Sequence, residues 1–164
     1  MKHDLRTLTL FLVTLLLCTF TRAKGQSLPV SEAHTIFITT NLADNQAYIA
    51  IGKVLTEQSI LFSVTSDGIL ISSQGNTFTD NQDAIFVGQL TVTGGLVKLT
   101  GQMRTPSKAN SNDPSDSKVV PIGYQKSKTS VSKAGFIYMN ELAKKLKPVL
   151  HGVIRYKAQK GTMS

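Results

Sequence analysis

The chain has 164 residues, of which 41% are hydrophobic and 17% are charged, and its formal net charge is +8 at pH 7. A chain of this length can bury one hydrophobic core without covalent cross-links. It contains a single cysteine, Cys18, which excludes a disulfide framework and a multi-cysteine zinc site.

The N-terminus carries the pattern of a cleavable export signal. Lys2 and Arg6 precede an apolar run over residues 8–20, and the small side chain of Ala23 offers a cleavage site. The run is shorter than the roughly 20 residues that span a bilayer. We therefore predict a signal peptide over residues 1–23 and no transmembrane helix in the mature chain. A retained membrane anchor is the alternative.

Cleavage of the signal peptide at this site also indicates the compartment in which the protein is located. Cleavage after Ala23 removes Cys18 and leaves a mature chain, residues 24–164, without a thiol and without an Asn-x-Ser/Thr glycosylation sequon. Such an exported chain is typical of a bacterial secreted, periplasmic or surface protein, so we predict an extracytoplasmic location. Lipidation of Cys18 is an alternative, which the bulky Leu17 before the cysteine disfavours.

The first part of the mature chain contains a faint internal repeat. Residues 43–56 and 79–92 align at an offset of 36, with Asp, Asn, Gln and Gly at matching positions. Each copy follows a β-branched segment, at residues 36–40 and 69–73, so we interpret each unit as strand, polar turn and strand. A chance match among turn residues is the alternative. Residues 79–83 fit an ordinary Asx-rich turn better than a calcium loop.

A hairpin is predicted with its turn at Asp67-Gly68. This turn sets Val64 opposite Ile71 on one face. The other face carries Leu61 and Leu70, which indicates burial on both sides of the hairpin.

The best-defined hairpin covers residues 85–103 and turns at Gly94-Gly95, where both residues suit a positive φ. In this register one face is apolar and the other is polar, as expected for a hairpin packed on one side. Facing glycines on the apolar side predict room for a large side chain from elsewhere in the chain, or a bend. The apolar pairs are Val92–Val97, Leu90–Leu99, Gly88–Gly101 and Phe86–Met103, and the polar pairs are Thr91–Lys98 and Gln89–Thr100.

Charge divides the mature chain into two parts. Residues 24–116 carry 5 basic and 8 acidic side chains, whereas residues 117–164 carry 10 basic side chains and one acidic one, Glu141. The stretch at the junction is rich in Pro, Ser, Asn and Asp and is predicted to be a long exposed loop. We predict a single β-rich domain over residues 24–164, with a β core at 24–104, the loop at 105–118 and a basic C-terminal part at 119–164.

The basic part is predicted to form a short helix and an edge strand. Two leucines lie one turn apart within residues 140–147, and Pro148 is expected to end the helix. The spacing of apolar residues allows the helix to begin as early as Ser132. Residues 152–157 alternate between apolar and basic side chains, as an edge strand would.

Together these elements predict a mainly β fold, an antiparallel β-sandwich or barrel-like domain with one short C-terminal helix. A β-solenoid fragment is the alternative, although two repeat copies are fewer than the about three that a free-standing solenoid needs.

No catalytic residue, cofactor site or metal site is predicted. The mature chain has two histidines, His34 and His151, which lie at opposite ends of the sequence. It contains no phosphate-binding glycine loop and no nucleophile elbow. A pair of carboxylates facing each other, as in a glycosidase, is the one enzymatic option that the composition leaves.

The basic part is the one positive indication of function. Nearby lysines and arginines attract anions such as an anionic polysaccharide, lipid headgroups or an acidic protein, while nucleic acid is not expected outside the cytoplasm. The alternative is that the basic side chains form an ordinary solvated surface and bind no partner. The hypothesis is a non-enzymatic binding or structural module of the bacterial envelope or surface, with a small envelope or glycan hydrolase as the runner-up; no oligomeric state is indicated. The predicted anion-binding residues are Lys144, Lys145, Lys147, Arg155 and Lys157.

Overall fold

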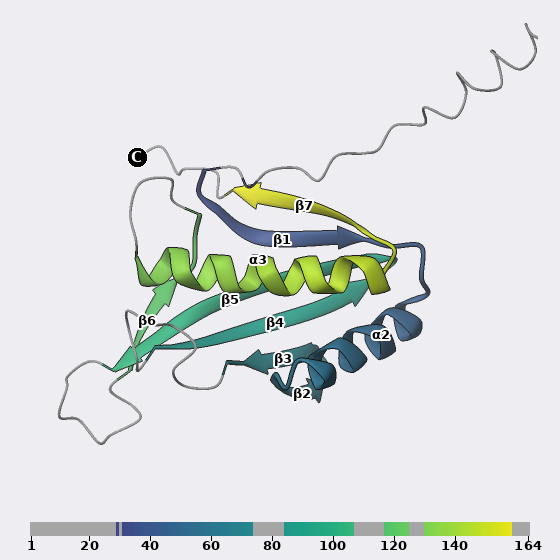
Figure 1. Ribbon diagram of the computed structural model, residues 1–164, viewed down its shortest axis with the longest axis horizontal. Helices are drawn as coiled ribbons and strands as arrows, with labels where there is room; N and C mark the ends of the chain where they lie inside the picture. Colours follow the sequence, from purple (N-terminus) through teal and green to yellow (C-terminus); the bar gives the residue numbers. More distant parts are fainter. Residues whose placement is uncertain (1–28, 30, 74–83, 107–116, 125–129, 159–164) are drawn as a thin grey trace, which may run out of the picture.

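A computed structural model of the chain describes residue 29 and residues 31–73, 84–106, 117–124 and 130–158. The predicted signal peptide, residues 1–23, lies outside the described residues. In chain order the elements are β1 (Ala33–Thr39), α2 (Asp44–Glu57), β2 (Leu61–Thr65), β3 (Gly68–Ser72), β4 (Ile85–Thr93), β5 (Leu96–Pro106), β6 (Ser117–Pro121), α3 (Val131–Val149) and β7 (Val153–Ala158) (Figure 1).

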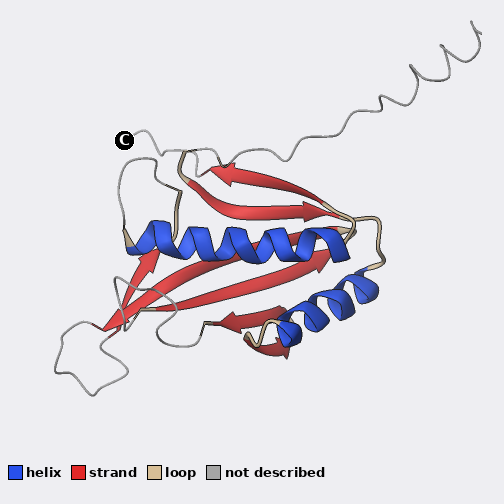
Figure 2. Cartoon of the chain, in the orientation of Figure 1, coloured by secondary structure: helices blue, strands red, loops and turns tan. Residues whose placement is uncertain are grey.

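The strands of the described residues form one antiparallel, 7-stranded sheet in the order β2-β3-β4-β5-β1-β7, with β6 paired to β5. Helices α2 and α3 both lie against the same face of this sheet (Figure 2). The predicted mainly antiparallel β class, with a C-terminal helix, is confirmed. The sheet does not close into a barrel, and its second layer consists of two helices rather than a second sheet.

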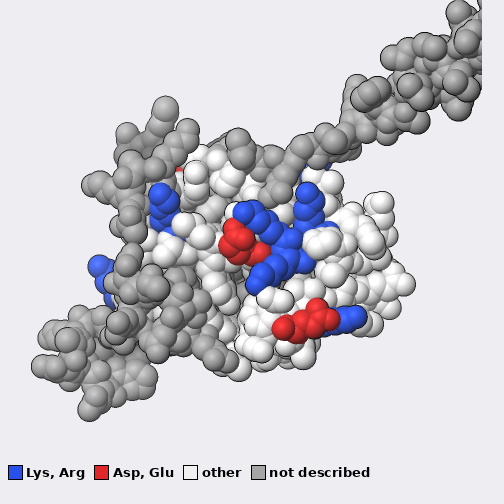
Figure 3. Space-filling view, viewed as in Figure 1, with Lys and Arg blue, Asp and Glu red and all other residues white. Residues whose placement is uncertain are grey.

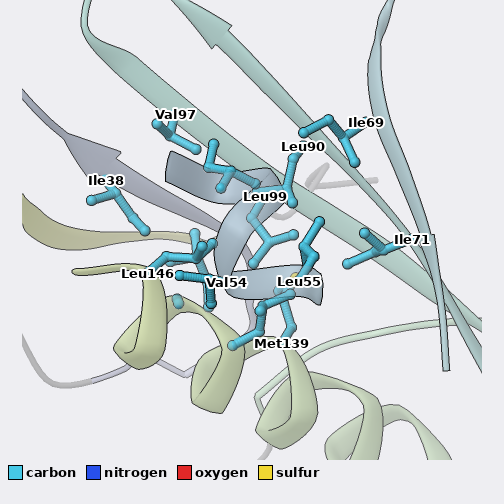
Figure 4. Close-up of a cluster of buried hydrophobic side chains, with 14 of the residues drawn as sticks. Ile38, Val54, Leu55, Ile69, Ile71, Leu90, Val97, Leu99, Met139 and Leu146 are labelled. Atoms are coloured by element: carbon cyan, nitrogen blue, oxygen red, sulfur yellow. The ribbon is translucent and has the colours of Figure 1, made fainter. Parts of the chain in front are cut away.

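The hydrophobic core fills the space between the sheet and the two helices (Figure 4). Burying one Leu, Ile or Phe side chain contributes about 1.5–3 kcal/mol, so this layer supplies most of the driving force for folding. Its fully buried members include Ile36 and Ile38 of β1, Leu90 of β4, Leu99 of β5, Ile51 and Leu55 of α2, and Phe136, Met139 and Leu146 of α3.

The hairpin β4–β5 has the register that the sequence predicted, with every predicted apolar pair in place. Gly94 and Gly95 form its turn with φ of 57° and 73°. The facing Gly88 and Gly101 make room for the ring of Phe86, because a Cβ atom at Gly101 would lie 2.5 Å from two ring carbons. The large side chain therefore comes from the hairpin itself, and not from elsewhere in the chain as was expected.

The predicted register of the β2–β3 hairpin is wrong by two residues. Val64 pairs with Ile69 rather than with Ile71, and Thr65 pairs with Gly68. The turn therefore consists of residues 66–67. Because the shift is an even number, each side chain keeps its predicted face.

The prediction that both faces of this hairpin are buried is also wrong. Leu61 is 56% exposed and Leu70 is 40% exposed. Both point away from the helices, since Ile69 and Ile71 of the same hairpin are buried on the helix side.

The strand predicted within residues 43–56 is a helix, α2. Ala47, Ile51 and Leu55 are buried and recur every four residues, which is the spacing of one helix face. Ile49 would share the face of Ile51 in a strand, but in the helix it is 73% exposed on the outer side.

The two copies of the sequence repeat therefore do not share a structure. Residues 44–57 form a helix, whereas residues 85–93 form strand β4. The polar segment of the second copy, residues 79–83, lies outside the described residues, and the Asx-turn prediction for it stays a prediction.

Helix α3 is longer than the predicted 140–147 and begins one residue before Ser132. Its N-cap is Ser130, whose hydroxyl accepts a hydrogen bond from the Lys133 N–H at 3.2 Å. Pro148 lies inside the last turn rather than after the helix.

Strand β7 follows α3 and is the edge strand that the sequence predicted. It pairs with β1. The acidic and basic parts of the chain therefore share one sheet.

The predicted exposed loop at residues 105–118 is bounded by paired strands. Thr105 of β5 pairs with Lys118 of β6, so both ends of the predicted loop belong to the sheet. Residues 107–116 lie outside the described residues.

Candidate functional site

The face of the sheet opposite the helices carries the candidate site. In β5 the buried Leu99 faces the helices, so Lys98 points to the other side. In β7 the buried Ile154 faces the helices, so Arg155 also points to the other side. Both helices of the described residues lie on the Leu99 side, and we call the opposite side the open face.

Strand register brings three side chains into one row across the open face. Phe37 of β1 pairs with Lys98 of β5 on one side and with Arg155 of β7 on the other. Because neighbouring strands lie about 4.8 Å apart, the Lys98 and Arg155 backbones are about 10 Å apart, with the half-buried Phe37 between them. Lys157 lies about 7 Å further along β7. We call Phe37, Lys98, Arg155 and Lys157 the open-face cluster.

Among the described strands, none supplies a carboxylate that could offset the charge of this cluster. Lys98, Arg155 and Lys157 are exposed, and none of the described strands contains an Asp or a Glu. Arg104 is exposed on the same face of β5, about 20 Å from Lys98. The carboxylates of the described residues lie instead before β1, in the helices and in the β2–β3 turn: Glu32, Asp44, Glu57, Asp67 and Glu141.

The structure divides the five predicted anion-binding residues between two surfaces. Lys144, Lys145 and Lys147 lie on α3, on the helix side of the molecule, where Figure 3 shows basic residues beside an acidic one. Arg155 and Lys157 point from β7 to the open face. These five residues therefore do not form the single surface that their closeness in the sequence suggested.

The lysines of α3 already have polar neighbours. Lys144 Nζ lies 2.7 Å from Glu141 Oε1, and this hydrogen bond raises the pKa of Lys144 above its usual value. Lys145 donates a hydrogen bond to the side-chain oxygen of Gln58 at the end of α2. Part of the positive charge on the helix side is therefore offset locally, whereas the described strands supply no carboxylate to the open face.

Sequence reasoning missed Lys98 and Phe37 as site residues. A signal for Lys98 was present, because the predicted register of the Gly94-Gly95 hairpin already placed it on the polar face opposite Thr91. Phe37 carried no such signal, since its position depends on the pairing of β1 with strands that lie far away in the sequence.

Asp44, the first residue of α2, is bound to the turn between β4 and β5. Its two carboxylate oxygens accept hydrogen bonds from the N–H groups of Gly94 and Gly95, each at 3.0 Å. These bonds, the one from Gly95 first, hold the pKa of Asp44 below its usual value. One helical turn further, the Tyr48 hydroxyl accepts a hydrogen bond from the Val92 N–H at 3.1 Å. These hydrogen bonds hold the start of α2 against the turn of the β4–β5 hairpin.

The described residues contain no cluster suited to metal binding. Within them, no three His, Cys, Asp or Glu side chains come close enough to share a metal ion. His34 belongs to β1, and His151 follows α3. Glu57 forms an ion pair with Lys53 at 3.9 Å, and Asp44 and Glu141 have the partners given above.

In the ranges that the structure describes, no helix has the length and apolar character needed to cross a bilayer.

No protein-family model matches the chain, and no curated protein matches it. The assignment of a function therefore depends on the geometry and charge of the open face.

Proposed function

We propose that the protein is an exported, non-enzymatic binding module of the bacterial envelope or surface that binds an anionic polysaccharide on its open face. One observation carries the proposal. Strand register aligns Lys98, Phe37 and Arg155 in a row beside Lys157, on a sheet whose described strands contain no carboxylate.

The spacing of the charges favours an extended ligand over a small one. The cationic side chains start about 7–10 Å apart on a sheet surface, whereas a site for a single small anion needs donors that converge on one point. A polysaccharide with one acidic group every sugar or two repeats its charge on this scale. Phe37 adds an apolar aromatic surface between the cations, which suits the C–H face of a sugar ring.

The export signal predicted at residues 1–23 supports the proposed location, because acidic polysaccharides of this kind occur outside the cytoplasmic membrane. Lipid headgroups and acidic proteins share the negative charge of the proposed ligand, and the experiment below separates them. The runner-up, a glycan hydrolase, needs two carboxylates that face each other. Among the described carboxylates, Asp44 is held by the hairpin turn, and Glu57 and Glu141 pair with lysines.

Two triple variants with the same change in charge test the proposal. The open-face variant combines Lys98→Gln, Arg155→Gln and Lys157→Gln. The control combines Lys144→Gln, Lys145→Gln and Lys147→Gln on α3. Each exposed contact contributes about 0.5 kcal/mol, so the open-face variant should bind heparin about tenfold more weakly at low salt, and the control should bind within about threefold of the unchanged protein.

Salt and a second probe complete the test. Exposed charges are screened over about 8 Å at physiological ionic strength, so binding of heparin should weaken steeply as the salt concentration rises. Equal losses in the two triple variants, or no binding at low salt, would contradict the proposal. Binding to vesicles of anionic lipid without binding to heparin would assign the open face to a lipid surface instead.

A further inference from the structure

The strands at the two ends of the strand order, β7 and β2, differ in how they are protected from pairing with another strand. At one edge, β7 carries Arg155 and Lys157, and basic residues on an edge strand oppose intermolecular pairing. At the other edge (Figure 1), β2 has the sequence LFSVT, without a charge or a proline, and all five of its residues are exposed. An edge of this kind is a template for another strand.

We propose that β2 pairs with β2 of a second copy of this chain in antiparallel register, with a two-fold axis through Ser63. The strand is self-complementary in this register. Phe62 falls opposite Val64 of the second copy, and Leu61 falls opposite Thr65. Phe62 is 38% exposed and Val64 is 72% exposed, so the pairing covers four exposed apolar side chains on the helix side of the two sheets.

The backbone groups of β2 are arranged for this register. Thr65 and Gly68 close the two-residue turn of the β2–β3 hairpin, and the pair that closes such a turn is a hydrogen-bonded pair. Because hydrogen-bonded and non-hydrogen-bonded pairs alternate along antiparallel strands, Phe62 and Val64 direct their N–H and C=O groups to the free edge. A two-fold axis through Ser63 places these groups opposite each other and forms about four hydrogen bonds between the copies.

Charge favours β2 over β7 as the self-pairing edge. In the proposed register no charged side chain of β2 meets another, because the strand has none. Two copies of β7 paired in the same way would bring Arg155 and Lys157 against each other, and like charges on opposite strands are destabilising.

The dimer is expected to be weak and dependent on concentration. A five-residue strand contributes a contact well below the about 1,600 Å² of a standard protein interface. The two-fold axis stands perpendicular to the sheet, so both pairs of helices lie on one side and both open faces on the other. The pairing itself does not depend on the proposed anion binding. Where both hold, the dimer presents two open-face clusters to one polymer.

Cysteine cross-linking tests the register. In a Cys18→Ser background, Ser63→Cys places two thiols in a non-hydrogen-bonded pair, with Cα atoms about 4.5 Å apart, which lies within the range that a disulfide bridges. In the matched control, Leu61→Cys, the two thiols are four residues apart along the paired strands, about 14 Å. Mild oxidation of the purified protein should yield a covalent dimer of the Ser63→Cys variant and not of the Leu61→Cys variant.

A charge placed on the edge tests the dimer without a covalent bond. Val64→Lys should raise the dissociation constant of the dimer, measured by analytical ultracentrifugation, by about tenfold or more. Ile137→Lys, which places the same side chain at a 47% exposed position of α3, should leave it unchanged. A protein that stays monomeric at all concentrations up to about 1 mM, equal cross-linking of both cysteine variants, or equal effects of both lysine variants would overturn the proposal.

Discussion

At the scale of single residues, Asp44 joins two parts of the fold that are far apart in the sequence. It begins α2, yet its carboxylate binds the N–H groups of Gly94 and Gly95 rather than capping its own helix. Both bonds are to the charged form, so they lower the pKa of the carboxyl group. The sequence placed this aspartate in a polar turn, and nothing near it in the chain indicates a partner 50 residues away.

The lowered pKa of Asp44 predicts how stability depends on pH. A carboxyl group whose pKa is lower in the folded state stabilises the fold above its unfolded pKa, about 3.9, and this contribution is lost as the pH falls through the folded pKa. Asp44→Asn should therefore lower the melting temperature at pH 7, and the difference from the unchanged protein should shrink below about pH 4. Thermal unfolding followed between pH 7 and acid pH measures it. A difference that does not vary with pH would show that the carboxylate charge is not involved.

At the scale of helices and strands, the sequence correctly predicted the elements whose hydrophobic pattern lies within a few neighbouring residues. The register of the β4–β5 hairpin was predicted to the residue, because its double-glycine turn and its alternating faces agree on one register. Strand β7 and the C-terminal half of α3 were predicted from period-two and period-four patterns of the same kind.

The elements that were predicted wrongly had a second pattern competing with the correct one. In α2 the apolar residues Ala47, Ile51 and Leu55 already have helical spacing, but a match of four turn residues to residues 79–92 favoured a strand. In the β2–β3 hairpin both Ser66-Asp67 and Asp67-Gly68 are reasonable turn pairs. The structure places the glycine after the turn, where its φ of 130° suits a residue without a side chain.

Because one face of the β4–β5 hairpin packs against the helices and the other does not, two neighbouring substitutions should lower the free energy of unfolding by unequal amounts. Leu90 is fully buried against the helices, so Leu90→Ala should lower the free energy of unfolding by about 2–5 kcal/mol. Thr91 is half-buried on the open face, so Thr91→Ala should lower it by less than about 1 kcal/mol. Chemical denaturation of both variants measures the difference. Similar losses at the two positions would mean that the hairpin does not pack on one side only.

At the scale of the whole molecule, the candidate site depends on pairings that no local pattern contains. The sequence grouped Lys144, Lys145, Lys147, Arg155 and Lys157 because they are close in the chain. Pairing of β1 with β5 and β7 instead joins Arg155 and Lys157 to Lys98, and helix α3 carries the remaining lysines to the other side. The charge excess of the C-terminal part can be counted from the sequence, but its division between two faces required the tertiary structure.

The same pairings predict that the part of the chain before α3 does not fold alone. A chain that ends at Ser130 lacks α3 and β7, and with them the buried Phe136, Met139, Leu142 and Leu146. Four such side chains contribute about 6–12 kcal/mol by burial, which is comparable to the about 5–15 kcal/mol of net stability of a whole domain. Loss of these side chains also leaves Ile36 and Ile38 of β1 uncovered.

We therefore expect the shortened chain to show no cooperative thermal transition by circular dichroism. Adding residues 131–164 as a separate peptide should restore the transition in part, because the missing helix and strand can pack again on the exposed sheet. A cooperative transition of the shortened chain within a few degrees of the full protein's midpoint would show that residues up to 130 form a domain on their own, and that α3 and β7 are an addition to its surface rather than part of its core.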